Sequence, residues 1–279
     1  MRYLYSFLLP LIISSSLLAQ STITGKVVDA ESGDVVPYVN IGIIELSTGT
    51  VSSIDGDFTL KYESEGDSVT FSSIGYKTKR ITIKELKSTP EVELESKIYV
   101  GEEIVVRAQS LGKLKVYGHK LEKKGGSIGY GNTELGTEVG ALINFKKPTL
   151  IESAHFTVNF TGADSMRYRL NVYKFEDGEV GENYLKENVL IYGPQKKGTF
   201  SIELNEYNLV VEGEVMLSLE YIEAINEEGK SGMMFRGKQV RRKSKANLYM
   251  KYTSLSPYTK PEYVNYQIGF YMLGRELGK

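Results

Sequence analysis

Residues 52–62 read Ser-Ser-Ile-Asp-Gly-Asp-Phe-Thr-Leu-Lys-Tyr, and this stretch decides the fold of the N-terminal part of the chain. From Phe58 to Tyr62 apolar and polar residues alternate, which is typical of a β-strand with one buried face. Asp55-Gly56 separates this strand from the short run Ser52–Ile54. Because Asp and Gly tolerate the positive φ angles of tight turns, the stretch predicts a β-hairpin that turns at Asp55-Gly56.

Short alternating runs of this kind recur along the whole chain after residue 20, and Gly, Asn and Asp separate them. No sustained apolar period of 3.6 residues with helix caps occurs there, so the pattern indicates antiparallel sandwiches or barrels. In the N-terminal part the alternating apolar residues are Ile23 and Val27, Val39, Ile41 and Ile43, Val69 and Phe71, Ile81 and Ile83, Val92 and Leu94, followed by the run Ile104–Arg107.

Nine further candidate strands follow in the C-terminal part. They are Val139–Phe145, Ile151–Phe160, Met166–Phe175, Val189–Tyr192, Thr199–Leu204, Val215–Ile222, Gly232–Arg236, Ala246–Tyr252 and Asn265–Leu273. About nine strands in some 150 residues is what a jelly-roll-like sandwich needs. We therefore expect an all-β protein in which a second, jelly-roll-like β-sandwich follows the first.

Several short pieces of the N-terminal part occur in a characteristic order and spacing. They are Ile23-Thr-Gly-Lys-Val-Val-Asp29, Gly33, Pro37-Tyr-Val-Asn-Ile41, Asp55-Gly-Asp-Phe-Thr-Leu60 and Ser72-Ser-Ile-Gly-Tyr76. Together they resemble the carboxypeptidase regulatory-like domain. The resemblance implies a transthyretin-like (prealbumin-like) β-sandwich of non-catalytic type. It also implies a secreted protein of Gram-negative bacteria, because a similar N-terminal module precedes the barrels of TonB-dependent receptors.

The first 19 residues have the features of a secretory signal peptide. Arg2 provides the positive start, Phe7–Ile13 the apolar segment, and Ala19 a small residue before cleavage at Gln20. We therefore expect export through a Sec-type signal peptide to the periplasm, the outer membrane or the cell surface, with no transmembrane span after cleavage.

Residues 108–132 differ in composition from both flanking parts. The run Lys113–Lys124 is rich in charge, and Gly125, Gly126, Gly129 and Gly131 follow it. This composition buries little surface and predicts a linker. The predicted organisation is a signal peptide at 1–19, a carboxypeptidase regulatory-like sandwich at 20–107, a linker at 108–132, and a C-terminal sandwich of unknown function at 133–279.

Composition excludes several classes of function. The 279 residues hold 34 Lys and Arg against 35 Asp and Glu, a net charge of −1, which disfavours nucleic-acid binding. The chain has no Cys and only two His, so thiolate catalysis, disulfides and Cys-ligated zinc are absent. We accordingly predict no cofactor and no metal site.

Three motifs carry possible chemistry, and each has a structural alternative that we favour. Gly125-Gly-Ser127-Ile-Gly129 matches the serine-hydrolase pattern, but a charged run precedes it and no helix is predicted after it. His119-Lys-Leu-Glu122 has the spacing of a zinc-binding pair without a third ligand, and His155 lies on a predicted strand. The acidic runs around Asp55 and Glu176 are typical of charged turns, with calcium as the alternative.

One charged segment is a candidate binding surface. It carries six positive charges in ten residues, at Arg236, Lys238, Arg241, Arg242, Lys243 and Lys245. We expect it to form a loop between two strands, either protecting sheet edges or contacting an anionic lipid or glycan surface. The 20 Tyr residues could stack on sugar rings, although β-sheets favour Tyr in any case.

The sequence therefore predicts a non-enzymatic secreted protein that binds or scaffolds, with a glycan or another envelope protein as its partner. One alternative is an accessory component of a TonB-dependent outer-membrane uptake system. A second alternative is a hydrolase with a carboxylate or Ser127 site.

Overall fold

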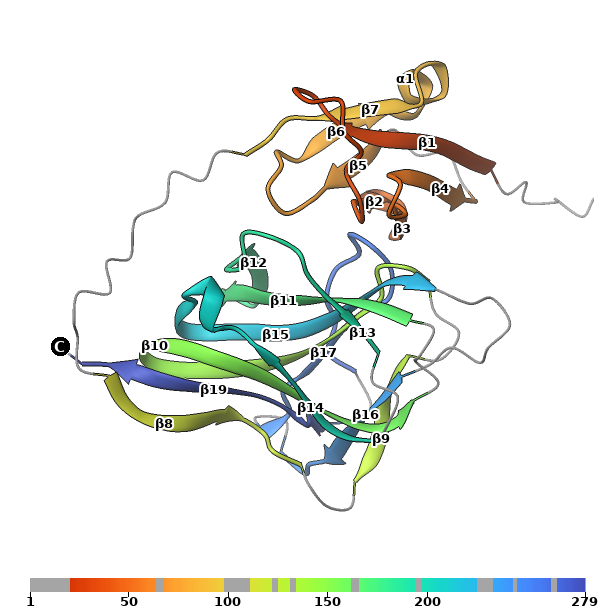
Figure 1. Ribbon diagram of the computed structural model, residues 1–279. Coiled ribbons are helices and arrows are strands. Elements are labelled where there is room, and N and C mark those ends of the chain that lie inside the picture. The colour runs from red at the N-terminus through yellow and green to blue at the C-terminus, as the bar shows by residue number, and fades with distance from the viewer. Residues whose placement is uncertain are drawn as a thin grey trace, which may run out of the picture.

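The computed structural model describes residues 21–63, 68–97, 111–121, 125–130, 134–161, 166–193, 197–224, 233–242, 245–261 and 265–278. Its described strands form one sandwich from residues 21–97 and a larger assembly from residues 111–278 (Figure 1). The all-β prediction is confirmed. The predicted signal peptide and the run Ile104–Arg107 lie outside the described residues.

The N-terminal sandwich consists of two small sheets. One has the order β4-β1-β7, from β1 (Ser21–Asp29), β4 (Asp57–Tyr62) and β7 (Glu91–Leu94). The other has the order β3-β2-β5-β6, from β2 (Asn40–Ile43), β3 (Thr48–Val51), β5 (Ser68–Ser72) and β6 (Lys79–Thr82). The core between them contains Val27, Ile41, Leu60 and Phe71, which the alternation placed on inward faces.

The turn at Asp55-Gly56 is present, but the predicted hairpin is wrong. Gly56 has a φ of +76°, and its N–H donates to Ser53 O at 3.1 Å. The strand after the turn, β4, pairs with β1, whereas β3 before it pairs with β2 in the other sheet. The turn therefore passes the chain from one layer of the sandwich to the other.

A short helix, α1 (Ile83–Ser88), interrupts the predicted run of strands at Ile83. A capping box starts it, because the Thr82 side chain accepts from the Glu85 N–H while the Glu85 side chain accepts from the Thr82 N–H. Two 3-10 turns, η1 (Ile44–Leu46) and η2 (Asn205–Tyr207), also occur.

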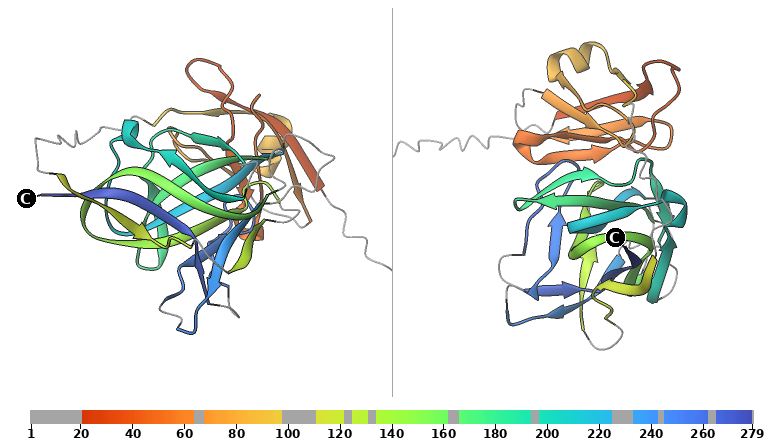
Figure 2. Two further views of the ribbon diagram at one scale, coloured as in Figure 1. Left: turned by 60° about the horizontal axis from the view of Figure 1, so that its bottom comes forward. Right: turned by 90° about the vertical axis from the view of Figure 1, so that its left-hand side faces the viewer.

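The C-terminal sandwich is organised around one long strand, β10 (Glu138–Thr161). The sequence predicts two strands here, and the chain instead continues through a register shift between Phe145 and Thr149, next to Pro148. The first half of β10 pairs with β15 and β17, and the second half pairs with β14, β16 and β19. Through these partners β10 connects the strands of the C-terminal part into one hydrogen-bonded sheet. Figure 2 shows this part of the molecule from two further sides.

The remaining strands of this sandwich are β11 (Met166–Glu176), β12 (Glu179–Asn183), β13 (Val189–Tyr192), β14 (Gly198–Glu203), β15 (Val210–Ala224), β16 (Met233–Gln239), β17 (Leu248–Lys251), β18 (Tyr266–Ile268) and β19 (Phe270–Leu277). Their inward side chains form one large apolar core. Within it, the ring of Phe270 meets the rings of Phe156 and Phe235 edge to face, with ring centroids 4.6 and 4.7 Å apart.

The predicted linker differs from the structure. Residues 108–132 contain two strands, β8 (Leu111–Gly118) and β9 (Gly126–Tyr130), which pair with β19 and β16 of the C-terminal sandwich. Tyr117 of β8 stacks on Phe145 at 4.6 Å. The charged and Gly-rich composition reflects strands at the margin of a sheet, where Lys residues face solvent, rather than a free linker.

Candidate functional site

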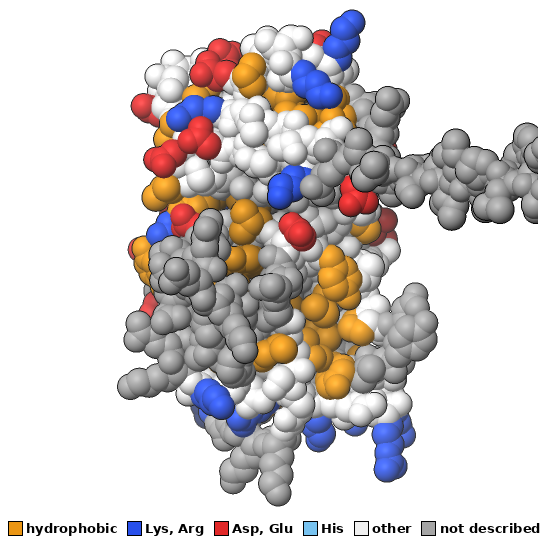
Figure 3. Space-filling view, turned by 90° about the vertical axis from the view of Figure 1, so that its right-hand side faces the viewer, with side chains coloured by type: hydrophobic (Ala, Val, Ile, Leu, Met, Phe, Trp, Pro, Cys, Tyr) orange, Lys and Arg blue, Asp and Glu red, His pale blue; other side chains and the backbone are white. Residues whose placement is uncertain are grey.

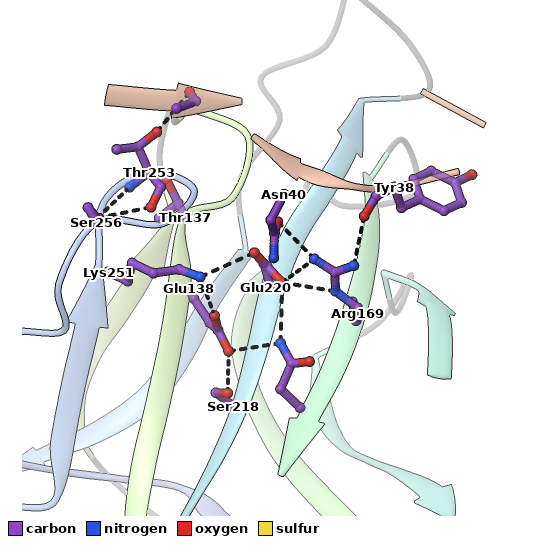
Figure 4. Close-up of polar contacts among 12 residues, drawn as sticks. Tyr38, Asn40, Thr137, Glu138, Arg169, Ser218, Glu220, Lys251, Thr253 and Ser256 are labelled. Carbon is purple, nitrogen blue, oxygen red and sulfur yellow. Dashed lines mark hydrogen bonds and ion pairs between the residues drawn. The ribbon is translucent and has the colours of Figure 1, made fainter. Parts of the chain in front are cut away.

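A buried cluster of charged side chains lies where the two sandwiches meet (Figure 4). Its centre is Arg169 of β11, whose guanidinium donates to Glu220 of the adjacent strand β15 at 2.9 and 2.7 Å. The two residues are direct neighbours in the strand register, and both side chains are at most 2% exposed. A paired guanidinium and carboxylate is the geometry in which an Arg is tolerated inside a protein.

A second pair of charges extends this junction cluster. Lys251 of β17 lies 2.8 Å from Glu138 and 3.2 Å from Glu220. Asn171 donates to both carboxylates at 3.0 and 3.3 Å, and Ser218 donates to Glu138. Two cations thus face two carboxylates, and the cluster is electrically neutral.

The junction cluster also holds the N-terminal sandwich. Arg169 Nη1 donates to the backbone oxygen of Tyr38 at 2.8 Å, and Nη2 donates to Asn40 Oδ1 at 2.9 Å. Tyr38 and Asn40 begin the second sheet of that sandwich. One guanidinium therefore bonds to both sandwiches and links them through polar contacts.

The charges keep one another ionised. Burial raises the pKa of Glu220, but Arg169 and Lys251 outweigh it and lower that pKa to about 2. Burial lowers the pKa of Lys251, and Glu138 and Glu220 raise it above its ordinary value. Glu220 and Lys251 therefore stay charged at neutral pH, and this arrangement is suited to holding structure.

Close backbone packing supports the same junction. A Cβ on Gly49 of β3 would lie 2.3 Å from the backbone oxygen of Ser254. Beside it, Thr253 Oγ1 donates to Gly49 O at 2.9 Å. Only glycine allows the loop that contains Thr253 and Ser254 to approach the β2–β3 hairpin this closely.

An aromatic contact completes the junction. The guanidinium carbon of Arg167 lies 5.6 Å from the ring centroid of Tyr38 and 4.8 Å from that of Tyr192. Arg167 also forms an ion pair with Glu223, with 3.2 Å between nitrogen and oxygen. Tyr38 also packs with Val51 and Ile222, which come from different sandwiches. The two sandwiches are therefore joined by polar, aromatic and apolar contacts together.

An open cleft runs beside the cluster along the junction. It consists of two adjoining cavities of about 490 and 630 Å³ that share Asn40, Ser72 and Tyr173 in their walls. The first is also lined by Ser73, Ile74, Tyr76, Thr78, Lys97, Arg169, Asn171, Gly181, Glu182, Asn183 and Lys186. The second is also lined by Gly178, Glu179, Val180, Lys251, Leu255, Ser256, Pro257 and Tyr258.

The cleft walls are polar and come from both sandwiches. An exposed ion pair between Lys97 and Glu182, at 3.3 Å, spans them beside the first cavity. The Ser73 hydroxyl is buried there with no hydrogen-bond partner among the described residues. The rings of Tyr173 and Tyr258, which line the second cavity, meet edge to face with their centroids 6.3 Å apart. Hydroxyl, amide and aromatic groups therefore line one continuous groove.

The basic segment lies elsewhere. Arg236 lies on β16, at the end of the predicted strand Gly232–Arg236. Lys238 also belongs to β16 and not to a loop, because β16 runs three residues further than the sequence predicts. Arg241, Arg242 and Lys245 follow the strand and are exposed, and Lys243 lies outside the described residues. The segment shares no lining residue with the cleft.

The other motifs occupy structural positions. Ser127 lies within β9 and accepts from Asn159 Nδ2 at 2.5 Å, so the glycine-rich pattern forms no turn between a strand and a helix. His155 of β10 stacks on Tyr271 at 4.5 Å and contacts Ser153 Oγ at 2.8 Å. Asp177 and Gly178 form the β11–β12 turn with positive φ. The described residues contain no group of three or more potential metal ligands.

Sequence reasoning missed the junction cluster. Arg169 and Glu220 lie inside β11 and β15, whereas Glu138 begins β10 and Lys251 ends β17. Alternation alone treats a charged residue at any of these positions as facing solvent. The available signal was that Arg169 and Glu220 interrupt runs with apolar residues on both sides.

The architecture is that of two docked β-sandwiches with a polar junction. Residues 23–106 match the family of the CarboxypepD_reg-like domain, so the N-terminal sandwich is a domain of this family, a β-sandwich module of non-catalytic type. A search of curated proteins found no match. Within the described parts of the chain, no helix combines the length and apolar character needed to cross a membrane.

Proposed function

We propose that the protein is an exported, non-enzymatic binding protein of the cell envelope, and that its interdomain cleft holds a glycan chain. The observation that carries this proposal is the junction cluster, which fixes both walls of the cleft through Arg169. A preformed site loses little conformational entropy when a ligand binds. The sequence features of residues 1–19 support export.

The shape and lining of the cleft favour an extended, hydroxyl-rich ligand. Two cavities that adjoin at Ser72 and Tyr173 suit consecutive units of a chain better than a single small molecule. Hydroxyls and amides can exchange hydrogen bonds with sugar hydroxyls, and Tyr rings can contact sugar faces. These features favour a glycan over an apolar ligand.

The two buried carboxylates of the junction cluster are poor candidates for hydrolysis. Glu138 and Glu220 are fully buried, and Lys251 bridges them. An acid or base must reach the proton that it transfers, and these groups are already engaged. This supports a binding role over the hydrolase alternative.

The experiment is a glycan array probed with the full chain, including bacterial envelope polysaccharides. Ser72→Trp fills the point that the two cavities share and should abolish the array signal. Ser201→Trp, on the exposed strand β14, is the matched control and should leave it unchanged. Equal binding by both variants, or no binding by the wild-type protein, would contradict the proposal.

The basic segment forms a second candidate binding surface. Lys238, Arg241, Arg242 and Lys245 are all exposed. Lys and Arg side chains gather at the lower end of the view in Figure 3, away from the N-terminal sandwich. Such a surface suits an anionic lipid or glycan layer, which would leave the cleft accessible.

Vesicles with and without phosphatidylglycerol test this second proposal. Replacing Arg241, Arg242 and Lys243 with Gln should weaken binding and flatten its dependence on salt, because fewer counterions are exchanged. Salt-insensitive or absent binding of the wild-type protein would leave the segment with edge protection as its role.

A further inference from the structure

A third cavity, of about 530 Å³, lies entirely within the C-terminal sandwich. Its lining includes Leu142, Asn144, Glu214, Lys245, Asn247 and Gln267. Three of these residues are amides, and we name the site the amide cavity after Asn144, Asn247 and Gln267. It shares no lining residue with the interdomain cleft.

Four polar side chains of the amide cavity make no bond within the described part of the fold. Among the described residues, the side chains of Asn144, Glu214, Lys245 and Gln267 make no hydrogen bond or ion pair. Asn144 and Glu214 are direct neighbours on β10 and β15. Asn144, Glu214 and Lys245 are exposed and Gln267 is half-buried, so water satisfies these groups in the free protein and a ligand can take its place.

Asn247 supplies the most constrained of these groups. Its backbone oxygen accepts from Leu142 N at 2.8 Å, its N–H donates to Tyr266 O at 3.0 Å, and its Oδ1 accepts from Ile268 N at 3.0 Å. These bonds hold the side chain between two strands. Its Nδ2 is buried and has no partner among the described residues, which leaves one fixed donor at the cavity wall.

The charges and chemistry of the lining select the ligand. Lys245 and Glu214 carry opposite charges, so the cavity has no net field that favours an anion or a cation. Amides donate and accept, while Leu142 and Ala246 add apolar surface. Burial lowers the pKa of His119, so its ring is neutral at pH 7 and can also accept.

We propose that the amide cavity binds one uncharged sugar ring. A pyranose offers several hydroxyls that both donate and accept, together with an apolar face, and this matches Asn144, Asn247 and Gln267 beside Leu142. The inference is independent of the interdomain cleft, because the two sites have separate walls. If both sites bind sugars, one glycan could engage the protein at two points and gain avidity.

The test uses the full chain and the methyl glycosides of glucose, galactose, mannose and N-acetylglucosamine, followed by NMR titration. At least one should bind with a dissociation constant on the order of millimolar, as expected for a single sugar held by a few hydrogen bonds. Asn144→Ala and Gln267→Ala should each weaken binding by about a factor of 10, the effect of one lost hydrogen bond.

Two controls keep the result specific. Gln239→Ala removes an exposed amide of β16 that does not line the cavity, and it should leave binding unchanged. Ser72→Trp blocks the cleft and should also leave it unchanged, which separates this inference from the proposed function. Absence of binding by all four glycosides, or binding that Asn144→Ala and Gln267→Ala do not affect, would overturn the inference.

Discussion

The junction cluster and the amide cavity contain the same kinds of side chain in opposite states. At the junction, Arg169, Asn171 and Glu220 have their hydrogen bonds filled by protein groups. In the amide cavity, Asn144 and Gln267 have no such bonds among the described residues. The junction side chains are buried, whereas Asn144 is exposed and Gln267 is half-buried. Burial together with filled hydrogen bonds, rather than residue type, therefore separates polar groups that hold the fold from those that can receive a ligand.

The largest effect should come from breaking the junction cluster. Arg169→Met leaves Glu220 facing Lys251 alone and removes both bonds to the N-terminal sandwich. We expect a loss of about 3–5 kcal/mol in the free energy of unfolding, as for other broken buried ion pairs. Urea denaturation measures it, with exposed Arg242→Met as the control. A loss below about 1 kcal/mol, the range of a surface ion pair, would show that the cluster is not structural.

The second-largest effect should come from acid, which weakens the junction cluster. The pKa of Glu220 is about 2 in the folded protein against an ordinary 4.5, so the unfolded chain takes up a proton first as the pH falls. The stabilisation from this group is therefore complete above about pH 4.5 and is lost as the pH falls toward 2, on the order of 3 kcal/mol. Urea denaturation between pH 6 and pH 2.5 measures the slope of the free energy of unfolding against pH. In Glu220→Gln that part of the slope should disappear, and an unchanged slope would contradict this assignment.

A smaller effect should follow from crowding the junction without touching a charge. Gly49→Ala places a methyl group 2.3 Å from Ser254 O, so the loop must move away from the β2–β3 hairpin. We expect a loss of about 1–3 kcal/mol, as for other overpacked sites, and cleavage near Ser254 at lower protease concentration. Gly126→Ala is the control, because its nearest neighbour would be 3.8 Å away. Equal behaviour of the two variants would count against close docking.

The smallest effect on stability should come from the amide cavity. Gln267→Ala removes a side chain that makes no hydrogen bond within the described structure, so the free energy of unfolding should change by less than about 0.5 kcal/mol. Thermal unfolding measures it beside Arg169→Met. If Gln267→Ala destabilises the protein as strongly as a buried polar substitution, the amide cavity is structural, and the contrast with the junction fails.

Sequence patterns predict the fold better than the sites, for physical reasons. Alternation identifies inward residues such as Ile41 and Leu60 because the pleat of a strand is a local property. The turn at Asp55-Gly56 is equally local, but the strands that flank it pair in different sheets, and only the packed sandwich determines that choice.

The sites depend on contacts that are distant in sequence. Arg169 meets Glu220 and Asn40 through strand register and domain docking, which no spacing along the chain encodes. The amide cavity collects Asn144, Glu214 and Gln267 from three separate strands. The basic segment was visible in the sequence because its charges are close together along the chain, although Lys238 lies on a strand and not in the predicted loop.

Hydrogen exchange of the side-chain amides, followed by NMR, tests the contrast between the two regions most directly. We expect the NH2 groups of Asn171 and Asn183, which donate within the junction at 2.9–3.3 Å, to exchange slowly in the free protein. The NH2 groups of Asn144 and Gln267 should exchange quickly and become protected only when a binding methyl glycoside is added. Fast exchange at Asn171, or protection of Asn144 and Gln267 without sugar, would contradict the account.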